Sequence, residues 1–377
     1  MIKVLHFYKT YYPDSFGGIE QVIFQLAEGG VSKGISSCVL SVSEHAGEDK
    51  QVIGQHTAYK SPQSFSIASN PFSWKVINKF KKLAEEADII HYHFPWPFMD
   101  MVQWISGIKK PSVVSYHSDI IRQQNLLKLY KPLMFHFLSK ADCIIATSPN
   151  YVETSDVLEK FKSKVTVIPI GLDKSTYPQV DDERLQKWGN KIGQPFFLFI
   201  GTLRYYKGLH ILIEAAVGAP YPIVIVGAGP IEEELKQQAR ALGLKNIHFL
   251  GALCDEDKVA LLKLSYCMVF PSHLRSEAFG ISLLEGAMFG KPMISSEIGT
   301  GTTYINVDNE TGLVVPPSHP SALRAAMDRL WNDRSFAQEC GAKAEKRFER
   351  MFTSEQMLEK HHEIYLRLLN RTPSMPS

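Results

Sequence analysis

The stretch YCMVFPSHLRSEAFGISLLEGAMF, Tyr266–Phe289, joins a strand pattern to a helix pattern through a polar loop. YCMVFPS is apolar without alternation, as in a strand that is buried on both faces of a sheet. HLRSEAFG predicts a loop, and ISLLEGAMF predicts a short helix that ends at Gly290, with Pro292 beyond it. A buried strand followed by a loop and a helix is the repeating unit of a doubly wound parallel sheet.

The same alternation of strands and helices runs through the chain, with one interruption. Residues 171–194 are polar and contain Pro, Gly and an acidic cluster, which indicates a connection between domains. We predict two doubly wound, Rossmann-like α/β domains over residues 1–175 and 176–355, with a helix over 356–372 that packs back on the first. Such sheets bind ligands beyond the carboxyl ends of their strands, so two of them facing across a cleft would hold a ligand between them. The predicted strands are 2–8, 36–42, 87–93, 111–117, 141–147, 165–171, 195–201, 221–227, 246–251, 266–272 and 291–297.

The composition is that of an ordinary globular protein. The chain has 377 residues, 45% hydrophobic and 21% charged, with a formal net charge of +2. This near balance gives no indication of nucleic-acid binding. We see no signal peptide and no apolar run of 18 residues, and we therefore expect a cytoplasmic protein. The five cysteines stand singly without a CxxC motif, so neither a zinc site nor a disulfide framework is predicted.

Two glutamates in the opening stretch are candidates for chemistry. Glu277 falls in the predicted loop and Glu285 in the predicted helix, whose free N–H groups near Phe279 and Gly280 lie between them. Carboxylates repel phosphate, so we expect them to accept hydrogen bonds from hydroxyl groups, for which a sugar and a ribose are good candidates. They could instead be a catalytic pair, or a loop charge and a helix charge that are neighbours only in sequence.

Two other loops could bind an anion. In IGTLRYYKG the strand ends at Gly201, and Arg204 and Lys207 could converge on one anion before the next helix, although surface-exposed cations are an equally good interpretation. In FGGIEQ, Gly17 and Gly18 precede a helix and would let a backbone approach an anion closely, or would simply form a tight turn.

Histidines follow two strands of the first half. His117 ends one predicted strand, and HYHFPWPF contains His91, His93 and Trp96. These side chains could form the polar and aromatic rim of an acceptor site. The alternative is that they are packing residues of the core.

Two motifs are set aside. Gly227 and Gly229 resemble a dinucleotide fingerprint, but Glu232 stands at its third glycine position, which disfavours an NAD(P) oxidoreductase. The D-x-D in 255–258 begins a predicted helix and is explained as an N-cap and first-turn charge, so no metal is assigned.

Taken together, these pieces resemble the retaining GT-B glycosyltransferases of family 4 over nearly the whole chain. GGIE is similar to the glycine loop of that family, GTLRYYKG to its diphosphate-binding Arg and Lys, and EAFGISLLE to its E-x7-E motif. The resemblance implies a nucleotide-sugar donor on the second domain, an acceptor on the first, and no cofactor. It leaves open a catalytically inactive sugar-binding protein and a nucleotide-sugar epimerase of the same fold.

The resemblance also implies a role for each matching residue. Arg204 and Lys207 would neutralise the leaving diphosphate, Glu277 would bind hydroxyls of the transferred sugar, and Glu285 would bind the ribose. His117 would touch the sugar near its anomeric carbon. The remaining implied contacts are Gly17 and Gly18 with the diphosphate, Leu253 beside the base, and the backbone N–H groups of Ala278, Phe279, Gly280 and Ile281 with the phosphates or sugar.

Three stretches narrow the likeness to bacterial mannosyltransferases that build O-antigen polysaccharide on a lipid carrier: HFPWPFMDM, SHLRSEAFGISLLEG and EIGTGT. This likeness implies GDP-mannose as donor and a polyprenyl-diphosphate-linked saccharide as acceptor, with GDP-rhamnose or a UDP-sugar as alternatives. In one departure, EIGTGTTYIN has no acidic residue where many family members have one.

Two basic stretches of the first domain could contact an anionic membrane at the inner face of the cell membrane. The alternative is that each is an ordinary amphipathic helix packed on a sheet. The residues concerned are Trp74, Lys75, Lys79, Phe80, Lys81 and Lys82, and Arg122, Lys128 and Lys131.

Overall fold

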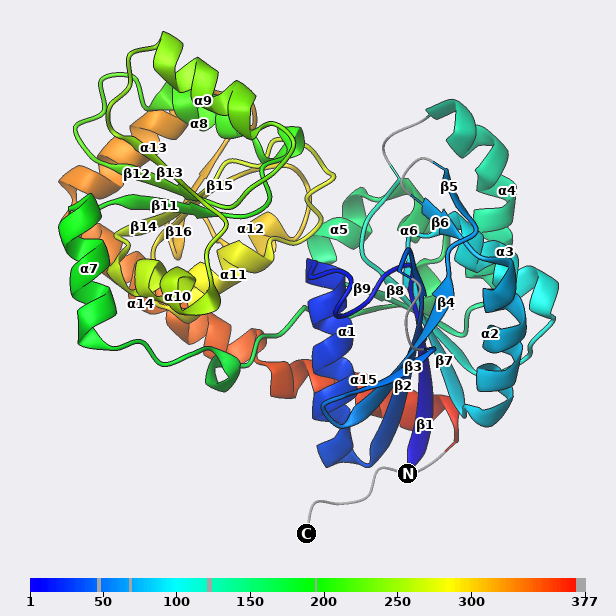
Figure 1. Cartoon of the computed structure of the whole chain (residues 1–377). Coiled ribbons are helices and arrows are strands. Elements are labelled where there is room, and N and C mark those ends of the chain that lie inside the picture. Colours follow the sequence, from blue (N-terminus) through cyan, green and yellow to red (C-terminus); the bar gives the residue numbers. More distant parts are fainter. Residues whose placement is uncertain (46–48, 68–69, 121–123, 194, 371–377) are drawn as a thin grey trace. The chain divides into compact units, whose positions relative to one another are not determined.

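The computed structural model describes residues 1–45, 49–67, 70–120, 124–193 and 195–370 (Figure 1). The chain forms two compact units, Met1–Ile170 with Ser354–Ser377, and Gly171–Thr353. Each unit is a mainly parallel sheet with helices on both faces (Figure 1). The predicted fold class, two doubly wound α/β units, is confirmed.

The first unit contains an eight-stranded sheet in the order β10-β9-β8-β7-β1-β2-β4-β3. All neighbours run parallel except β3 and β4. β1 lies between β7 and β2, so the strand order reverses direction at the β1–β7 pair. The strands are β1 (Ile2–Phe7), β2 (Ile35–Ser43), β3 (Lys50–Ile53), β4 (His56–Pro62), β7 (Ile89–Phe94), β8 (Ser112–Tyr116), β9 (Cys143–Ala146) and β10 (Val165–Val167), and a separate hairpin joins β5 (Phe65–Ile67) to β6 (Asn70–Phe72).

Helices cover both faces of this sheet. α1 packs closely against α15, since a Cβ on Gly29 would lie 2.3 Å from the Leu358 side chain. α2, α3 and α4 pack side by side (Figure 1). Their bounds are α1 (Gly18–Gly29), α2 (Trp74–Glu86), α3 (Pro97–Ser106), α4 (Gln124–Lys140), α5 (Pro149–Thr154), α6 (Asp156–Lys160) and α15 (Ser354–Leu368).

The second unit contains a six-stranded parallel sheet in the order β13-β12-β11-β14-β15-β16. β11 and β14 are neighbours, although two strands separate them in sequence, so the order reverses at this pair. Apart from the edge strand β13, which is half-buried, the short strands are buried on both faces, which is why they show no alternation in sequence. They are β11 (Phe197–Ile200), β12 (Ile223–Val226), β13 (Ile247–Gly251), β14 (Cys267–Phe270), β15 (Met293–Ser296) and β16 (Gly312–Val315).

The helices of this unit form two layers. α8, α9 and α13 pack on one face, and α7, α10, α11 and α14 lie on the other (Figure 1). Their bounds are α7 (Asp182–Ile192), α8 (Leu209–Ala215), α9 (Glu232–Ala241), α10 (Asp255–Leu264), α11 (Ile281–Met288), α12 (Thr302–Ile305), α13 (Pro320–Asn332) and α14 (Arg334–Met351). Within the residues that the structure describes, none of the helices is long and apolar enough to cross a membrane.

Candidate active site

The reversal point of the second sheet brings two loops together. The loop after β11 contains Arg204 and Lys207, and the loop after β14 contains Glu277. Because β11 and β14 are adjacent and parallel, both loops leave the same edge of the sheet. Ligands of doubly wound sheets bind at this kind of position.

Lys207 and Glu277 form an ion pair in this edge, between the Lys207 ammonium and Oε2 of Glu277. The two side chains are only 12% and 11% exposed. Ser272 donates to the same Oε2 at 3.3 Å, and the ammonium of Lys207 lies 4.8 Å from the centre of the Phe270 ring. Oε1 of Glu277 has no hydrogen-bond partner among the described residues, so it is available to a hydroxyl group.

Glycine at position 208 allows the two loops to approach each other closely. Gly208 has a φ of +70°, and a Cβ on it would lie 2.0 Å from the carbonyl oxygen of Pro271 in the other loop. His273 ties the loops together further, since its backbone N–H donates to the carbonyl of Tyr206 at 3.0 Å and its Nε2 lies 3.1 Å from the carbonyl oxygen of Tyr205. The two loops therefore form one rigid surface.

The helix that follows, α11, begins at this surface. Its N-cap is Gly280, whose φ of +102° belongs to the left-handed region that glycine tolerates. The backbone N–H groups of Ala278, Phe279, Gly280 and Ile281 have no acceptor within the part of the chain that the structure describes. They present unpaired donors beside the Lys207–Glu277 pair, as expected from sequence.

Glu285 lies one turn into α11. Burial raises the pKa of its carboxyl group, and the hydroxyl of Tyr177, which donates to Oε1 at 2.9 Å, acts in the opposite direction. A half-buried glutamate whose carboxylate already accepts one hydroxyl suits the predicted ribose contact. Tyr177 belongs to the connection between the units, and no motif in the sequence points to it.

The other predicted contacts of this unit differ in exposure. The Arg204 side chain is exposed and has no ion-pair or hydrogen-bond partner among the described residues, so it is free to reach an anion. Leu253 is half-buried in the loop between β13 and α10. Phe279 is buried at 4% exposure, which leaves only its backbone for a ligand.

The GAG segment after β12 has a structural explanation. A Cβ on Gly227 would lie 2.0 Å from the carbonyl oxygen of Gly201, and one on Gly229 would lie 2.3 Å from that of Leu203. The amide of Leu203 donates to Ala228 at 3.0 Å. These glycines let two loops touch through their backbones, and this close contact accounts for the motif without a dinucleotide.

The EIGTGT segment supports the E-x7-E loop. The side chain of Arg275 donates to the carbonyl of Gly299 at 2.8 Å, and the amide of Gly301 donates to that of Ala278 at 2.9 Å. A Cβ on Gly301 would lie 2.4 Å from the Phe279 ring.

The D-x-D carboxylates belong to the first turn of α10, as predicted, where Asp257 accepts from Trp188 at 2.9 Å; the N-cap, however, is Cys254.

In the first unit, Gly17 is the N-cap of α1 and Gly18 its first residue. The first turn carries a buried carboxylate, Glu20, which accepts from the hydroxyl of Thr10 at 2.7 Å. A Cβ on Gly17 would lie 2.4 Å from that carboxylate, so a larger residue here would displace the Glu20 side chain.

The rim interpretation of the histidines is wrong. His91 and His93 are each 0% exposed, because β7 is a central strand whose faces are both covered, and Trp96, the N-cap of α3, is also 0% exposed. His117 is 8% exposed, and its Nε2 lies 3.0 Å from Nδ1 of His93. Burial lowers the pKa of His117 to about 3, so the ring is uncharged at neutral pH.

The basic stretch on α2 is partly an ordinary amphipathic helix. Phe80 is 0% exposed and packs in the core, and the ammonium of Lys79 is bound by the carbonyl of Lys60 at 2.6 Å and by Asp49 at 3.2 Å. Lys75 and Lys82 are exposed. Arg122 lies outside the described residues.

Comparison with known families gives two matches that together span most of the chain. A sequence model described as Glycosyltransferase Family 4 matches residues 16–176, and one described as Glycosyl transferases group 1 matches residues 180–347. The chain is also 59% identical over 353 residues to D-rhamnosyltransferase WbpZ of Pseudomonas aeruginosa, which covers 94% of this chain and 93% of that protein. The chain belongs to the family 4 glycosyltransferases of the GT-B fold. The predicted family and enzyme class are confirmed.

Two further similarities agree with the assignment of this glycosyltransferase to its family. It is 48% identical over 368 residues to O-antigen chain mannosyltransferase C of Escherichia coli, with 98% of this chain and 99% of that protein covered. Its structure matches sucrose-phosphate synthase of Thermosynechococcus elongatus with a TM-score of 0.81, covering 98% of this chain and 100% of that one. At 19% identity, the latter match concerns the fold alone.

Proposed function

We propose that this glycosyltransferase moves a hexose from a GDP-hexose to a lipid-linked saccharide of O-antigen biosynthesis, with retention at the anomeric carbon. The two relatives named above, an O-antigen chain mannosyltransferase and a D-rhamnosyltransferase, support the reaction class and the kind of polysaccharide.

The nearly buried Lys207–Glu277 pair carries the proposal. In this proposal the ammonium of Lys207 binds the diphosphate as it leaves the donor, and a cation about 4 Å from a phosphate oxygen contributes about 4 kcal/mol at an intermediate dielectric constant. Arg204, exposed and unpaired among the described residues, supplies a second charge. Glu277 balances the charge of Lys207 through Oε2 and accepts a sugar hydroxyl through Oε1.

In the proposed reaction, the acceptor hydroxyl oxygen bonds to the anomeric carbon while the bond from that carbon to the diphosphate breaks. The departing phosphate oxygen takes the hydroxyl proton on the same face, so no protein base is required. The role of the protein is to orient the donor and to stabilise the charge that develops on the diphosphate.

GDP-mannose is the donor that we propose first, and GDP-D-rhamnose is the second candidate because the relative at 59% identity is a D-rhamnosyltransferase. D-Rhamnose is 6-deoxymannose, so the two sugars differ only at C6. A site that hydrogen-bonds the C6 hydroxyl would reject the deoxy sugar by about 10⁴-fold, whereas a site that leaves C6 in an apolar pocket would discriminate by only about 10- to 200-fold.

The test is turnover by the purified chain with GDP-mannose, GDP-D-rhamnose and a UDP-hexose, each with and without a synthetic polyprenyl-diphosphate-linked saccharide. Mass spectrometry should show an acceptor heavier by one sugar with one or both GDP-hexoses. Transfer from the UDP-hexose alone would contradict the proposed donor class. Conversion of the donor sugar in the absence of acceptor would favour the epimerase alternative.

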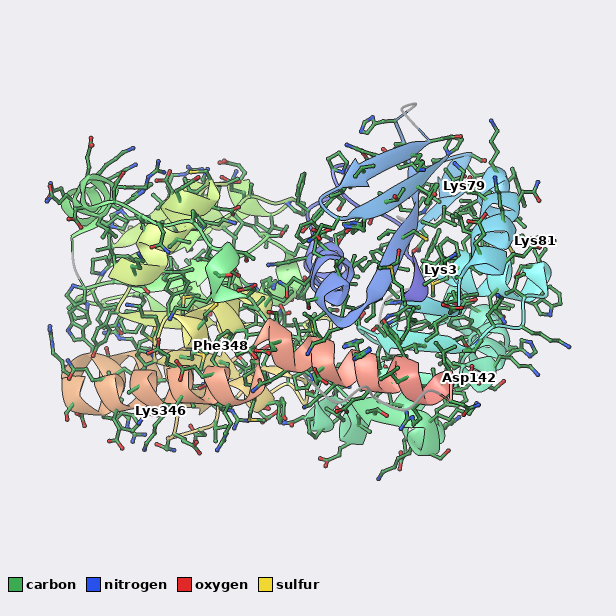
Figure 2. All side chains as sticks on the ribbon, turned by 90° about the horizontal axis from the view of Figure 1, so that it is seen from below. Lys3, Lys79, Lys81, Asp142, Lys346 and Phe348 are labelled. Carbon is green, nitrogen blue, oxygen red and sulfur yellow. The ribbon has the colours of Figure 1, made fainter. Side chains whose placement is uncertain are left out.

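A lipid-linked acceptor suggests that the first unit docks on an anionic membrane of the cytoplasmic face. Trp74 is 60% exposed at the start of α2, and its ring lies 6.1 Å from that of Phe65 on the β5–β6 hairpin, next to Ile67 at 51% exposure. Exposed aromatic and apolar side chains beside lysines are what an interfacial surface contains. Lys79 and Lys81 lie on α2 (Figure 2), and Lys128 is exposed on α4 next to Leu129 in sequence.

Flotation with vesicles containing anionic lipid tests this docking. The variant with Lys75, Lys82 and Lys128 changed to Glu should lose most of its vesicle binding. A control with Lys187, Lys263 and Lys346 changed to Glu has the same net charge but alters the second unit, and it should bind normally. Equal binding by both variants would contradict the docking surface.

A further inference from the structure

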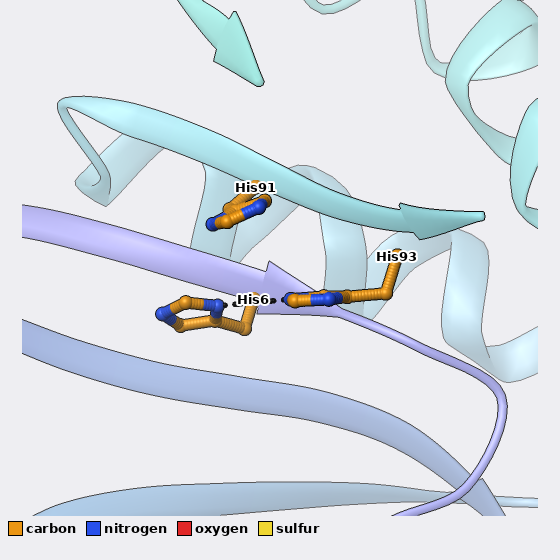
Figure 3. Close-up of side chains that lie close together, drawn as sticks. All are labelled: His6, His91 and His93. Atoms are coloured by element: carbon orange, nitrogen blue, oxygen red, sulfur yellow. Dashed lines mark hydrogen bonds between the residues drawn. The ribbon is translucent and has the colours of Figure 1, made fainter. Parts of the chain in front are cut away.

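The first unit contains a stack of buried histidine rings that the proposed reaction does not explain. His6 lies on β1 and His91 and His93 on β7, where His6 and His91 are paired across the two strands (Figure 3). The ring centres of His91 and His93 are 4.5 Å apart, those of His6 and His93 5.4 Å, and those of His93 and His117 5.3 Å. The stack lies at the point where the strand order reverses, which is the ligand-binding position of such sheets.

Three of these rings form one hydrogen-bonded chain. Nδ1 of His6 lies 3.1 Å from Nε2 of His93 (Figure 3), and Nδ1 of His93 lies 3.0 Å from Nε2 of His117. Both nitrogens of His93 are therefore engaged within the chain. His91 is separate, because its nitrogens bond to the hydroxyls of Tyr365 at 2.7 Å and Ser115 at 2.8 Å.

The rings are uncharged at neutral pH. Burial lowers the pKa of His6 and of His117 to about 3, and it lowers that of His93 well below the ordinary value. A neutral imidazole has one N–H and one lone pair. Because His93 must donate on one side and accept on the other, only two arrangements satisfy both bonds: all three rings carry their proton on Nδ1, or all three carry it on Nε2.

The ends of the chain favour the first arrangement. Nε2 of His6 has no partner among the described residues, and His6 is 1% exposed whereas His117 is 8% exposed, so an N–H without a partner costs less at the His117 end. At the other end, Nδ1 of His117 also has no partner within the described residues. With the proton on Nδ1, His117 offers a donor to a ligand oxygen.

We propose that His6 and His93 are positioning residues that fix the tautomer of His117, so that His117 presents its Nδ1–H to an oxygen of the donor sugar. The three hydrogen-bonded histidines thereby provide a hydrogen-bond donor that carries no positive charge. The identity of this ligand rests on the proposed function, but the shared tautomer does not.

A metal site is the other use that three clustered histidines suggest. The ligating atoms of His6, His91 and His93 lie within 4.8 Å of one another. The rings of His91 and His93 are inclined by only 21°, however, so their in-plane lone pairs run alongside each other rather than converging. Their nitrogens are also occupied by the hydrogen bonds described above, so we favour the tautomer chain.

The test begins without substrate, with ¹⁵N-labelled imidazoles in the full-length protein at pH 7. Two-bond ¹H–¹⁵N spectra, assigned with single histidine variants, should show His6, His93 and His117 all as the Nδ1–H tautomer. His93→Leu should change the signals of His6 and His117. His91→Leu, which removes an equally buried ring of the same stack, should leave both unchanged.

Different tautomers in the three rings, or Nε2–H in all of them, would overturn the proposal. So would stoichiometric zinc binding that removes these signals from the wild-type spectrum.

Turnover with a GDP-hexose gives the second measurement. His93→Leu should lower kcat by about 10- to 100-fold, the range known for residues that orient a ligating histidine, with little change in the KM for the donor. His93→Gln keeps one donor and one acceptor and should recover part of the loss, and His91→Leu should stay within about threefold of wild type. Equal losses in His93→Leu and His91→Leu would contradict a positioning role. Failure of the wild type to use any GDP-hexose would count against the proposed function and leave the spectroscopic result standing.

Discussion

The two units have the same architecture but place different chemistry at the reversal point of the sheet. In the first unit, β1 and β7 bring together uncharged histidines, whose burial lowers their pKa values. In the second unit, β11 and β14 bring Lys207 beside Glu277. The topology of a doubly wound sheet therefore decides where a site lies, and the side chains at that place decide whether it suits an anion or a neutral hydroxyl-bearing ligand.

The largest effect should come from removing the charge of the second unit. Lys207→Ala should lower kcat with a GDP-hexose by about 10²- to 10³-fold, the cost of losing one preorganised group that stabilises a developing negative charge. Steady-state kinetics measure this. Lys236→Ala, which removes a lysine from the surface pair with Glu232, is the control and should retain activity. Wild-type turnover by Lys207→Ala would contradict the assignment of the second unit as the one that binds the nucleotide-sugar donor.

Next in size is the effect of separating the two loops of the second unit. Gly208→Ala should cost about 3 kcal/mol or more, because the left-handed backbone is strained and the new Cβ would meet Pro271. Gly218 also has a φ of +70° but has nothing within 4 Å of a new Cβ, so Gly218→Ala should cost only about 1 kcal/mol. Chemical denaturation measures both, and equal losses would show that loop contact is unimportant.

The units should also differ in their response to acid. His6 has a pKa of 6.5 in the unfolded chain and about 3 in the folded chain. Between these two pH values it is protonated only in the unfolded chain. The free energy of unfolding is therefore unaffected by this histidine above pH 6.5 and decreases as the pH falls toward 3. The loss is about 2 kcal/mol at pH 5.

Hydrogen exchange measured by mass spectrometry at pH 8 and pH 5, corrected for intrinsic rates, checks this prediction. Protection should fall more in β1, β7 and β8 than in β11 and β14. The same loss in both units would mean that the histidine stack does not set the acid response.

The smallest effect concerns Glu285. Tyr177→Phe removes a hydrogen bond to its carboxylate and should cost about 1.5 kcal/mol at a pH where the carboxylate is charged. The cost should shrink as the pH falls and Glu285 becomes protonated, since the bond stabilises the charged form. Denaturation curves of the two proteins at pH 7 and pH 4 provide the comparison, and a cost that does not vary with pH would contradict this account.

The sequence was informative wherever structure depends on neighbours along the chain. Runs such as PFFLFIG are apolar because both faces of the strand are covered, and each of the eleven predicted strands overlaps an observed one. β3, β4, β5 and β6 were missed because they are partly exposed and have no continuous apolar run, and three of them are only three or four residues long. β16 was missed because its signal is four residues long.

Contacts between distant residues could not be obtained in this way. Lys207 and Glu277 are 70 residues apart, and their contact depends on β11 lying next to β14, which only the sheet order reveals. The same holds for the chain from His6 to His117 and for Tyr177. The motifs around Lys207 and Glu277 predicted a site, but its internal bonds required the fold.

The central claim is that the second unit binds the nucleoside diphosphate through charge and that the first unit does not. Calorimetric titration of GDP, which carries no hexose, tests it most directly with Lys207→Ala and His117→Ala. Lys207→Ala should weaken GDP binding by about tenfold or more, the loss expected when a charged group that contacts a phosphate is removed, while His117→Ala should bind GDP as the wild type does. The reverse pattern, in which His117→Ala loses GDP and Lys207→Ala does not, would contradict the account.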